Sequence, residues 1–169
     1  MIVISCGSSP QPRPEPHLGA GEPAHESFIT TLDGGTITEE FYISTRLEVQ
    51  QFIQNLNQII RSRNFNEWRA VLSPQLFAEI SSEENLRQIS EQPIMRNRRI
   101  VLRNAQDYFF HVVVPSRVNI SDEVDDIDIE FITLTSVRAF TVTTTRAGEE
   151  QQVLLYALEK VDNSWTIIN

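Results

Sequence analysis

The last third of the chain carries three segments with the composition of β-strands. Residues 137–145 are rich in β-branched and aromatic side chains, residues 153–161 form a second such run, and residues 165–168 form a third. Residues 146–149, which include a glycine, and residues 162–164 supply polar turns between the runs. The pattern predicts a three-stranded antiparallel meander, one face of which must be covered by other apolar side chains.

The best cover for this sheet is an amphipathic helix predicted over residues 47–63. Thr45 and Glu48 have the spacing of a capping box at its start. Glutamine and asparagine fill one face of the helix, and apolar residues recur at helical spacing on the other. These apolar residues are Val49, Phe52, Ile53, Leu56, Ile59 and Ile60.

Shorter helices are predicted between this helix and the meander. Residues 66–72 form one, and Ser73–Pro74 opens another because serine caps a helix and proline suits its first position. Ser81 and Glu84 repeat the capping-box spacing, which predicts helix to about residue 92, where Pro93 stops it.

The segments that flank this helical region give weaker patterns. Residues 105–113 repeat apolar positions at helical spacing up to Pro115, although their β-branched valines leave a strand as an alternative. Residues 126–131 alternate acidic and apolar side chains, which predicts a strand with one wet face. Before the long helix, a strand over 28–32, a turn over 33–35 and an extended piece over 40–43 are predicted.

The charge and residue types of the chain exclude several classes of function. A net charge of -9 disfavours nucleic-acid binding and electrostatic attachment to anionic lipid. One cysteine allows no internal disulfide, and we predict neither a metal site nor a cofactor. The acidic segment around residues 119–130 lacks the glycine of a calcium loop. His111 could be a base at the rim of a pocket, but without a carboxylate partner it is interpreted as a flanking residue. The basic cluster is interpreted as a solvated linker: Arg96, Arg98, Arg99 and Arg103.

The first residues resemble the end of a bacterial lipoprotein signal peptide. Val3-Ile4-Ser5-Cys6 has two apolar residues, a small residue and then a cysteine, although the basic and long apolar parts of such a peptide are missing. The resemblance implies that membrane lipid is attached to Cys6 in the bacterial cell envelope, with the domain in the periplasm or at the cell surface. Residues 1–5 would be a signal-peptide remnant, residues 6–27 a disordered proline-rich tether, and residues 28–169 a single domain.

The order of elements over residues 45–169 resembles the nuclear transport factor 2-like superfamily, which has a cystatin-like cone fold. The resemblance is carried by the long helix, the turn at residues 64–68, Leu72-Ser73-Pro74 and the closing hairpin at residues 155–167. It implies an α+β fold in which N-terminal helices pack on a curved antiparallel sheet around a cone-shaped cavity. No stretch matches an active-site motif of the superfamily, so no catalytic residue is assigned. The candidates for lining the cavity are Trp68, Tyr108, Arg138, Tyr156 and Trp165.

Residues 153–158 are apolar on both alternating faces, so the face away from the helices needs its own cover. Either residues 28–43 or a second copy of the chain, in a homodimer, could supply that cover. The sequence thus favours a non-catalytic lipoprotein whose domain binds a small hydrophobic ligand or a protein partner. The alternative is an isomerase or dehydratase of the same fold, which would need an acid on an apolar strand face; Glu159 is the nearest candidate.

Overall fold

A computed structural model describes residues 28–32, 35–117, 127–144 and 150–169. The predictions for Cys6, the tether and the turn at residues 146–149 lie outside these residues. The described elements are β1 (Phe28–Leu32), β2 (Gly35–Thr38), α1 (Glu39–Arg61), α2 (Phe65–Ala70), α3 (Pro74–Ser81), α4 (Glu83–Ser90), α5 (Pro93–Arg98), α6 (Ala105–Tyr108), a π-helical turn η1 (Phe109–Val113), α7 (Val114–Arg117), β3 (Ile127–Thr133), β4 (Ser136–Thr144), β5 (Glu150–Val161) and β6 (Ser164–Ile167).

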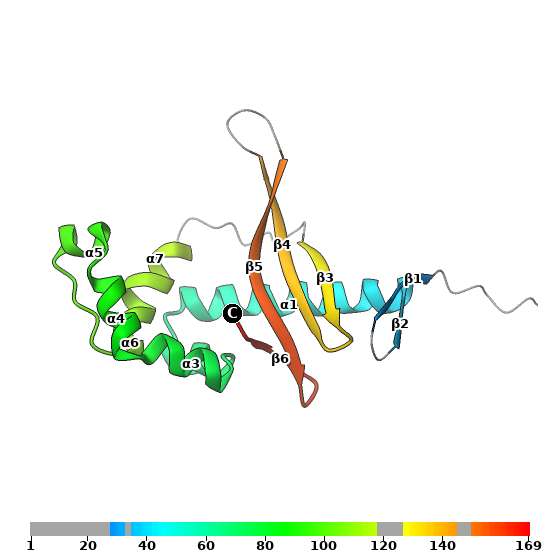
Figure 1. The fold of residues 1–169 in the computed structure, drawn as a ribbon, viewed down its shortest axis with the longest axis horizontal. Helices are drawn as coiled ribbons and strands as arrows, with labels where there is room; N and C mark the ends of the chain where they lie inside the picture. Colours follow the sequence, from blue (N-terminus) through cyan, green and yellow to red (C-terminus); the bar gives the residue numbers. More distant parts are fainter. Residues whose placement is uncertain (1–27, 33–34, 118–126, 145–149) are drawn as a thin grey trace, which may run out of the picture.

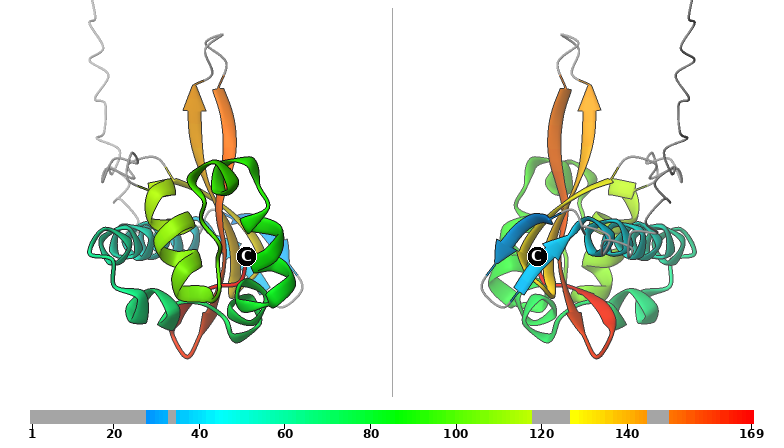
Figure 2. Two further views of the ribbon diagram at one scale, coloured as in Figure 1. Left: turned by 90° about the vertical axis from the view of Figure 1, so that its left-hand side faces the viewer. Right: turned by 90° about the vertical axis from the view of Figure 1, so that its right-hand side faces the viewer.

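A four-stranded antiparallel sheet crosses the long helix α1. The strands lie in the order β3-β4-β5-β6, and β1 and β2 form a separate antiparallel hairpin. The hairpin lies at the start of α1 and helices α3–α7 lie at its far end, with the sheet between them (Figures 1 and 2). The predicted α+β arrangement, with helices packed on an antiparallel sheet, is confirmed.

The core lies between α1 and one face of the sheet. Val49 and Ile53 of α1 are almost fully buried, as are Val137 of β4 and Leu158 of β5. Val137 and Leu158 are cross-strand partners, so both side chains lie on the same face of the sheet. Apolar side chains of this size each contribute roughly 1.5–3 kcal/mol when fully buried. The amphipathic stripe predicted for this helix therefore forms the core.

Helix α1 begins seven residues earlier than the capping-box spacing predicts. The hydroxyl oxygen of Thr38 accepts a hydrogen bond from the backbone N–H of Phe41 at 3.1 Å, and Thr38 is the N-cap. Thr45 is instead buried inside the helix. The rings of Phe41 and Tyr42 pack on Phe131 of β3, with centroid distances of 5.6 and 6.3 Å. These long-range contacts stabilise the extra turns, and the prediction of an extended segment at residues 40–43 is wrong.

Two further predicted helix boundaries are displaced. The cap of α4 is Ser82, whose hydroxyl accepts from the backbone N–H of Asn85, whereas Ser81 ends α3 and donates to the carbonyl of Phe77. Pro93 does not merely stop a helix, because it occupies the first turn of α5. The basic cluster is therefore partly helical, because Arg96 and Arg98 lie within α5.

The segment 105–117 is helical, and its strand alternative is wrong. Pro115 does not end it: α7 runs through this proline to Arg117. Proline has no N–H to donate to the carbonyl of His111, and its ring would collide with that carbonyl in a regular α-helix. The π-helical turn η1 widens the helix just before this position, with the N–H of Val114 bonded to the carbonyl of Phe109. We attribute the π turn to Pro115.

Strand β5 contains a bulge. Tyr156 pairs with Ala139 and Leu154 pairs with Phe140, so Leu155 is an extra residue without a partner on β4. The bulge interrupts the simple alternation expected for residues 153–158, and Leu155 and Tyr156 both line one cavity.

Candidate functional site

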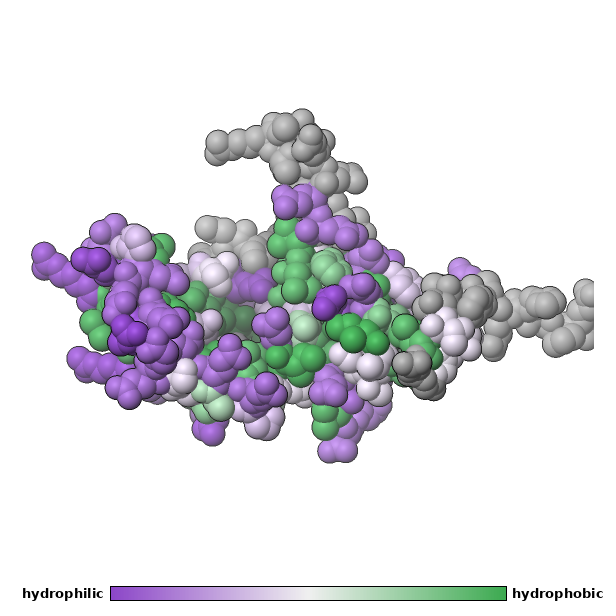
Figure 3. All heavy atoms as spheres, in the orientation of Figure 1, coloured by the Kyte–Doolittle hydropathy of each residue, from purple (hydrophilic) through white to green (hydrophobic). Residues whose placement is uncertain are grey.

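A cavity of about 360 Å³ lies between α3, the α6–α7 helical segment and the bulged part of β5. Its position corresponds to the hollow with an apolar floor between the helical end of the molecule and the sheet (Figure 3). This volume is at the small end of the range of about 300–1,000 Å³ for clefts that hold small molecules. The apolar lining residues are Ile60, Trp68, Leu72, Leu76, Ile80, Val113, Leu155 and Ile167. The polar lining residues are Glu79, Asn85, Tyr108, Ser116, Arg117, Tyr156 and Asn169.

An aromatic cluster forms one wall of the cavity. Trp68 of α2 is buried and stacks on Tyr108 of α6, with ring centroids 6.4 Å apart. The ring of Phe109 is fully buried, and its centroid lies 4.9 Å from that of Trp68, so it packs against the indole and holds it in place. Burial raises the pKa of the Tyr108 hydroxyl above its ordinary value. The wall thus presents a neutral phenol on a rigid apolar base.

Arg117 and Tyr156 form a polar part of the cavity lining. The guanidinium carbon of Arg117 lies 4.9 Å from the centroid of the Tyr156 ring. Burial raises the pKa of Tyr156, and the neighbouring positive charge of Arg117 opposes part of that rise. The positive charge of Arg117 therefore lies in the lining of the cavity, next to the Tyr156 ring.

The structure brings together three of the five residues predicted to line a cavity: Trp68, Tyr108 and Tyr156. Arg138 is not among the lining residues. It lies exposed on the face of the sheet away from α1, 3.4 Å from Glu130, its cross-strand partner. This surface pair contributes little to stability.

Trp165 is also absent from the cavity lining. Its indole N–H donates to the carboxylate of Glu48 on α1 at 3.2 Å, and the same carboxylate oxygen accepts from the Lys160 ammonium at 2.6 Å. Trp165 therefore links β6 to the long helix and has a structural role.

Sequence reasoning missed Arg117, Glu79 and Asn85. Arg117 follows Pro115, which predicts the end of the element, and only the π turn carries the helix to this arginine. In a π turn, residues five apart lie on one face, which is how Tyr108 and Val113 come to line the same cavity. Glu79 and Asn85 lie on consecutive short helices whose packing no local pattern reveals.

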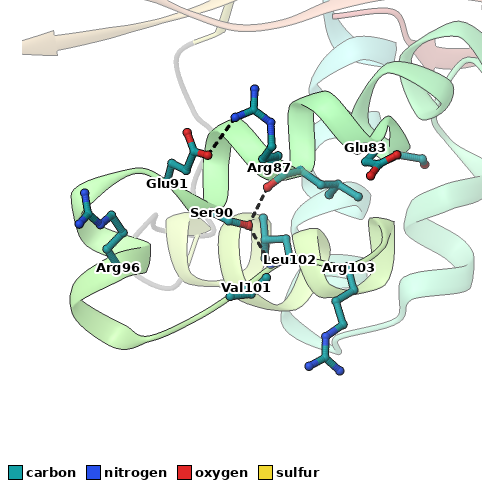
Figure 4. A pocket seen from close by; sticks show the side chains of 10 residues that line it. Glu83, Arg87, Ser90, Glu91, Arg96, Val101, Leu102 and Arg103 are labelled. Atoms are coloured by element: carbon teal, nitrogen blue, oxygen red, sulfur yellow. Dashed lines mark hydrogen bonds and ion pairs between the residues drawn. The ribbon is translucent and has the colours of Figure 1, made fainter.

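A second hollow of about 720 Å³ lies between α4, α5 and residues 101–103 (Figure 4). Its chief cation, Arg87, is already paired with Glu84 at 2.8 Å and Glu91 at 2.9 Å. Ser90 donates to the carbonyl of Leu86 and accepts from the N–H of Leu102, which fixes the hollow's floor. Arg96 and Arg103 point away from each other at its margins (Figure 4). Its charged groups do not converge on one point, which makes it a weaker candidate for a binding site.

The residues considered for catalysis lie apart from the cavity. His111 is exposed. Glu159 of β5 is also exposed, and its cross-strand partner on β6 is Thr166. Among the described residues, no group of three or more His, Cys, Asp or Glu side chains is arranged to hold a metal ion. In that same part of the chain, no helix is sufficiently long and apolar for a transmembrane span.

Together, the elements define a small α+β domain with a long helix under an antiparallel sheet and a cavity at one end. No protein-family model matches the chain. The chain is 30% identical over 140 residues to an uncharacterized lipoprotein of Treponema pallidum (strain Nichols), covering 83% of this chain and 69% of that protein. The chain belongs to the family of this lipoprotein, and the predicted recognition of a lipoprotein is confirmed.

Among solved structures, the chain is similar to an NTF2-like protein from Campylobacter jejuni, at 16% identity and a TM-score of 0.36. The match covers 71% of this chain and 96% of that one. The assignment of the fold therefore rests on the element order and the sheet of this chain itself.

Part of β5 stays accessible to solvent. Val153 and Leu154 are 40% and 45% exposed, so the described residues of the chain leave both of them partly open. The homodimer through the outer sheet face stays a prediction.

Proposed function

We propose that the protein is a non-catalytic, lipid-anchored protein of the bacterial cell envelope whose domain binds a small hydrophobic ligand in the 360 Å³ cavity. The observation that carries the proposal is the composition of the lining. Apolar side chains around Trp68 form one part of the lining, and polar groups that include Tyr108 and Arg117 stand beside them. Sites for small molecules combine apolar surface with polar groups that fix the orientation of the ligand. Membership of a lipoprotein family supports the envelope location.

The aromatic wall supports ligand binding rather than catalysis. Trp68 is held by Phe109 and Tyr108, so the wall needs little ordering when a ligand enters. The isomerase or dehydratase alternative requires an acid or base on an apolar face. Glu159 and His111 are exposed to solvent and are not among the residues that line the cavity.

Trp68 provides a reporter for the test. The chain has two tryptophans, so Trp165→Phe leaves Trp68 as the single indole in the protein. With Cys6→Ser to keep the chain free of lipid, titration with octanol should change the Trp68 emission in a saturable way. Thermal unfolding should shift upward with octanol concentration.

Two substitutions that introduce a larger side chain distinguish the proposed site from the second hollow. Ser116 is an exposed lining residue of the proposed site, and Ser116→Phe should place a ring in the cavity and abolish the response. Val101 lines the second hollow and is 67% exposed, so Val101→Phe should leave octanol binding unchanged. An emission that never saturates, or a response lost only with Val101→Phe, contradicts the proposal.

A further inference from the structure

Two donors on the cavity wall have no carboxylate partner within the described part of the chain. Arg117 is half-buried, and no carboxylate of the described residues lies within ion-pair distance of its guanidinium. Its partner is Tyr156, which a neutral hydrogen bond and a ring contact join to the guanidinium, so the positive charge itself has no anion beside it in that part of the chain. The hydroxyl of Tyr108, also half-buried, makes no hydrogen bond to any described residue. Donors in partly desolvated positions are normally satisfied, because leaving them unpaired is costly.

The two donors differ from the other polar groups of the cavity. The side-chain amide of Asn85 already donates to the carbonyl of Ile80 at 3.2 Å, and the hydroxyl of Ser116 donates to the carbonyl of Val113 at 2.8 Å. Glu79 is exposed, so water solvates its carboxylate. The Tyr108 hydroxyl and the Arg117 guanidinium therefore suit a ligand group that accepts hydrogen bonds.

The charge of Arg117 decides what kind of acceptor suits the site. Arginine cannot shed its proton in a protein, so burial cannot neutralise it. Covering it with an apolar ligand would leave a buried, unpaired cation, which is strongly unfavourable. An ionised carboxylate only accepts hydrogen bonds and matches the planar fork of a guanidinium.

We infer that the ligand is a hydrophobic carboxylate, with its aliphatic or aromatic body against the Trp68 wall and its carboxylate held by Arg117. This inference rests on the proposed function, since it names the class of ligand for the same cavity. Tyr108 supplies a second donor within the cavity. Trp68, Leu72 and Leu155 enclose the body of the ligand.

Three probes with one alkyl chain test the head group. Octanoate, octanol and octylamine are titrated against the full chain with Cys6→Ser, and binding is measured by calorimetry at low salt. We expect octanoate to bind roughly tenfold more tightly than octanol, because hydrogen bonds to charged groups are stronger than neutral ones. Octylamine should bind most weakly, because its ammonium faces the arginine.

Substitution of Arg117 isolates its part in this preference. Arg117→Met keeps an unbranched side chain and removes the charge, so the affinity for octanoate should fall to that for octanol while octanol binding is retained. Arg117→Lys keeps the charge but lacks the planar guanidinium, so it should preserve part of the preference for octanoate over octanol. This variant replaces Arg117→Met in the test if the methionine variant does not fold. Ser116→Phe should abolish binding of all three probes.

The outcomes separate this inference from the proposed function. Equal affinities for octanol and octanoate, or tightest binding of octylamine, would overturn the carboxylate inference while ligand binding stands. A preference for octanoate that survives Arg117→Met would overturn the role of Arg117. Failure of all three probes to bind overturns the proposed function, and the inference with it.

Discussion

The three tyrosines of the chain share one physical property despite their different places. Burial raises the pKa of Tyr108 and of Tyr156. Tyr42 has a raised pKa through burial and through the Asp128 carboxylate, which accepts a hydrogen bond from its hydroxyl at 2.7 Å. In each case the folded state favours the neutral phenol.

Because of this property, the folded chain should lose stability in alkali. The unfolded tyrosines release their protons near pH 10.0, whereas the folded ones keep theirs. Above that pH the unfolded state binds fewer protons, so the free energy of unfolding must fall as pH rises. Denaturant unfolding between neutral pH and pH values above 10 measures the loss, and ultraviolet absorbance should show phenolate appearing later in the folded chain.

Tyr108→Phe is the matched control for this prediction. It keeps the ring against Trp68 and removes one titrating group, so its stability should fall less steeply in alkali than that of the unsubstituted chain. Phenolate titration with an ordinary midpoint for all three tyrosines in the folded chain would contradict the prediction.

At the residue scale, large aromatic residues are the ones that the sequence identifies. Trp68, Tyr108 and Tyr156 combine apolar area with a polar tip, and all three reach the cavity. Trp165 has the same character but is held by Glu48, a partner 117 positions away in the chain. Arg117 is hidden from such reasoning because Pro115 is ordinarily a stop signal. The chemical type of a side chain can therefore be read from the sequence, whereas the direction in which it points depends on contacts with residues far away in the chain.

At the scale of elements, the sequence predicts the existence of helices and strands better than their limits. The meander, the amphipathic helix and the strand at residues 127–133 are all present. The capping-box spacing fails twice, at Thr45 and at Ser81, because a serine or threonine three residues before a glutamate also occurs within or beside a helix. The true caps, Thr38 and Ser82, have Phe41 and Asn85 at the third position after them.

The displaced cap gives a direct comparison between neighbouring serines. Ser82→Ala removes the acceptor for the N–H of Asn85 and should reduce the free energy of unfolding by about 1 kcal/mol. Ser81→Ala removes only a bond from its hydroxyl to the carbonyl of Phe77, and the loss should be smaller. Urea unfolding of the two variants measures both values. A larger loss for Ser81→Ala would show that the sequence pattern, and not the structure, gives the correct cap.

At the scale of the whole molecule, the helix-and-sheet domain and the predicted lipid attachment lie in different parts of the chain. The described helices and strands lie between Phe28 and Ile167, whereas the lipid attachment is predicted from Val3–Cys6, outside the described residues. The family relationship supports the prediction of lipid attachment, which would otherwise rest on four residues alone.

Lipid attachment at Cys6 can be tested on the intact protein. Expressed in a bacterium from the gene with the codons upstream of Met1, the chain should gain the mass of attached acyl chains and sediment with membranes. Each buried methylene adds about 0.8 kcal/mol of anchoring, so more than one chain is needed for firm attachment. Cys6→Ser should remove both the added mass and the membrane association. An unmodified chain in the supernatant would contradict the anchor.

Helix α1 sets how far the cavity stands from β1, the described element that follows the predicted tether. Its 23 residues span about 35 Å at 1.5 Å per residue, with β1 at its beginning and Ile60, a cavity residue, in its last turn. The hydrocarbon core of a bilayer is about 30 Å thick, slightly less than this helix is long. With lipid on Cys6, the chain enters the domain at the end opposite the cavity. For the ligand that we propose, we therefore expect exchange directly with the aqueous compartment, at a rate that does not depend on whether the domain rests on a membrane.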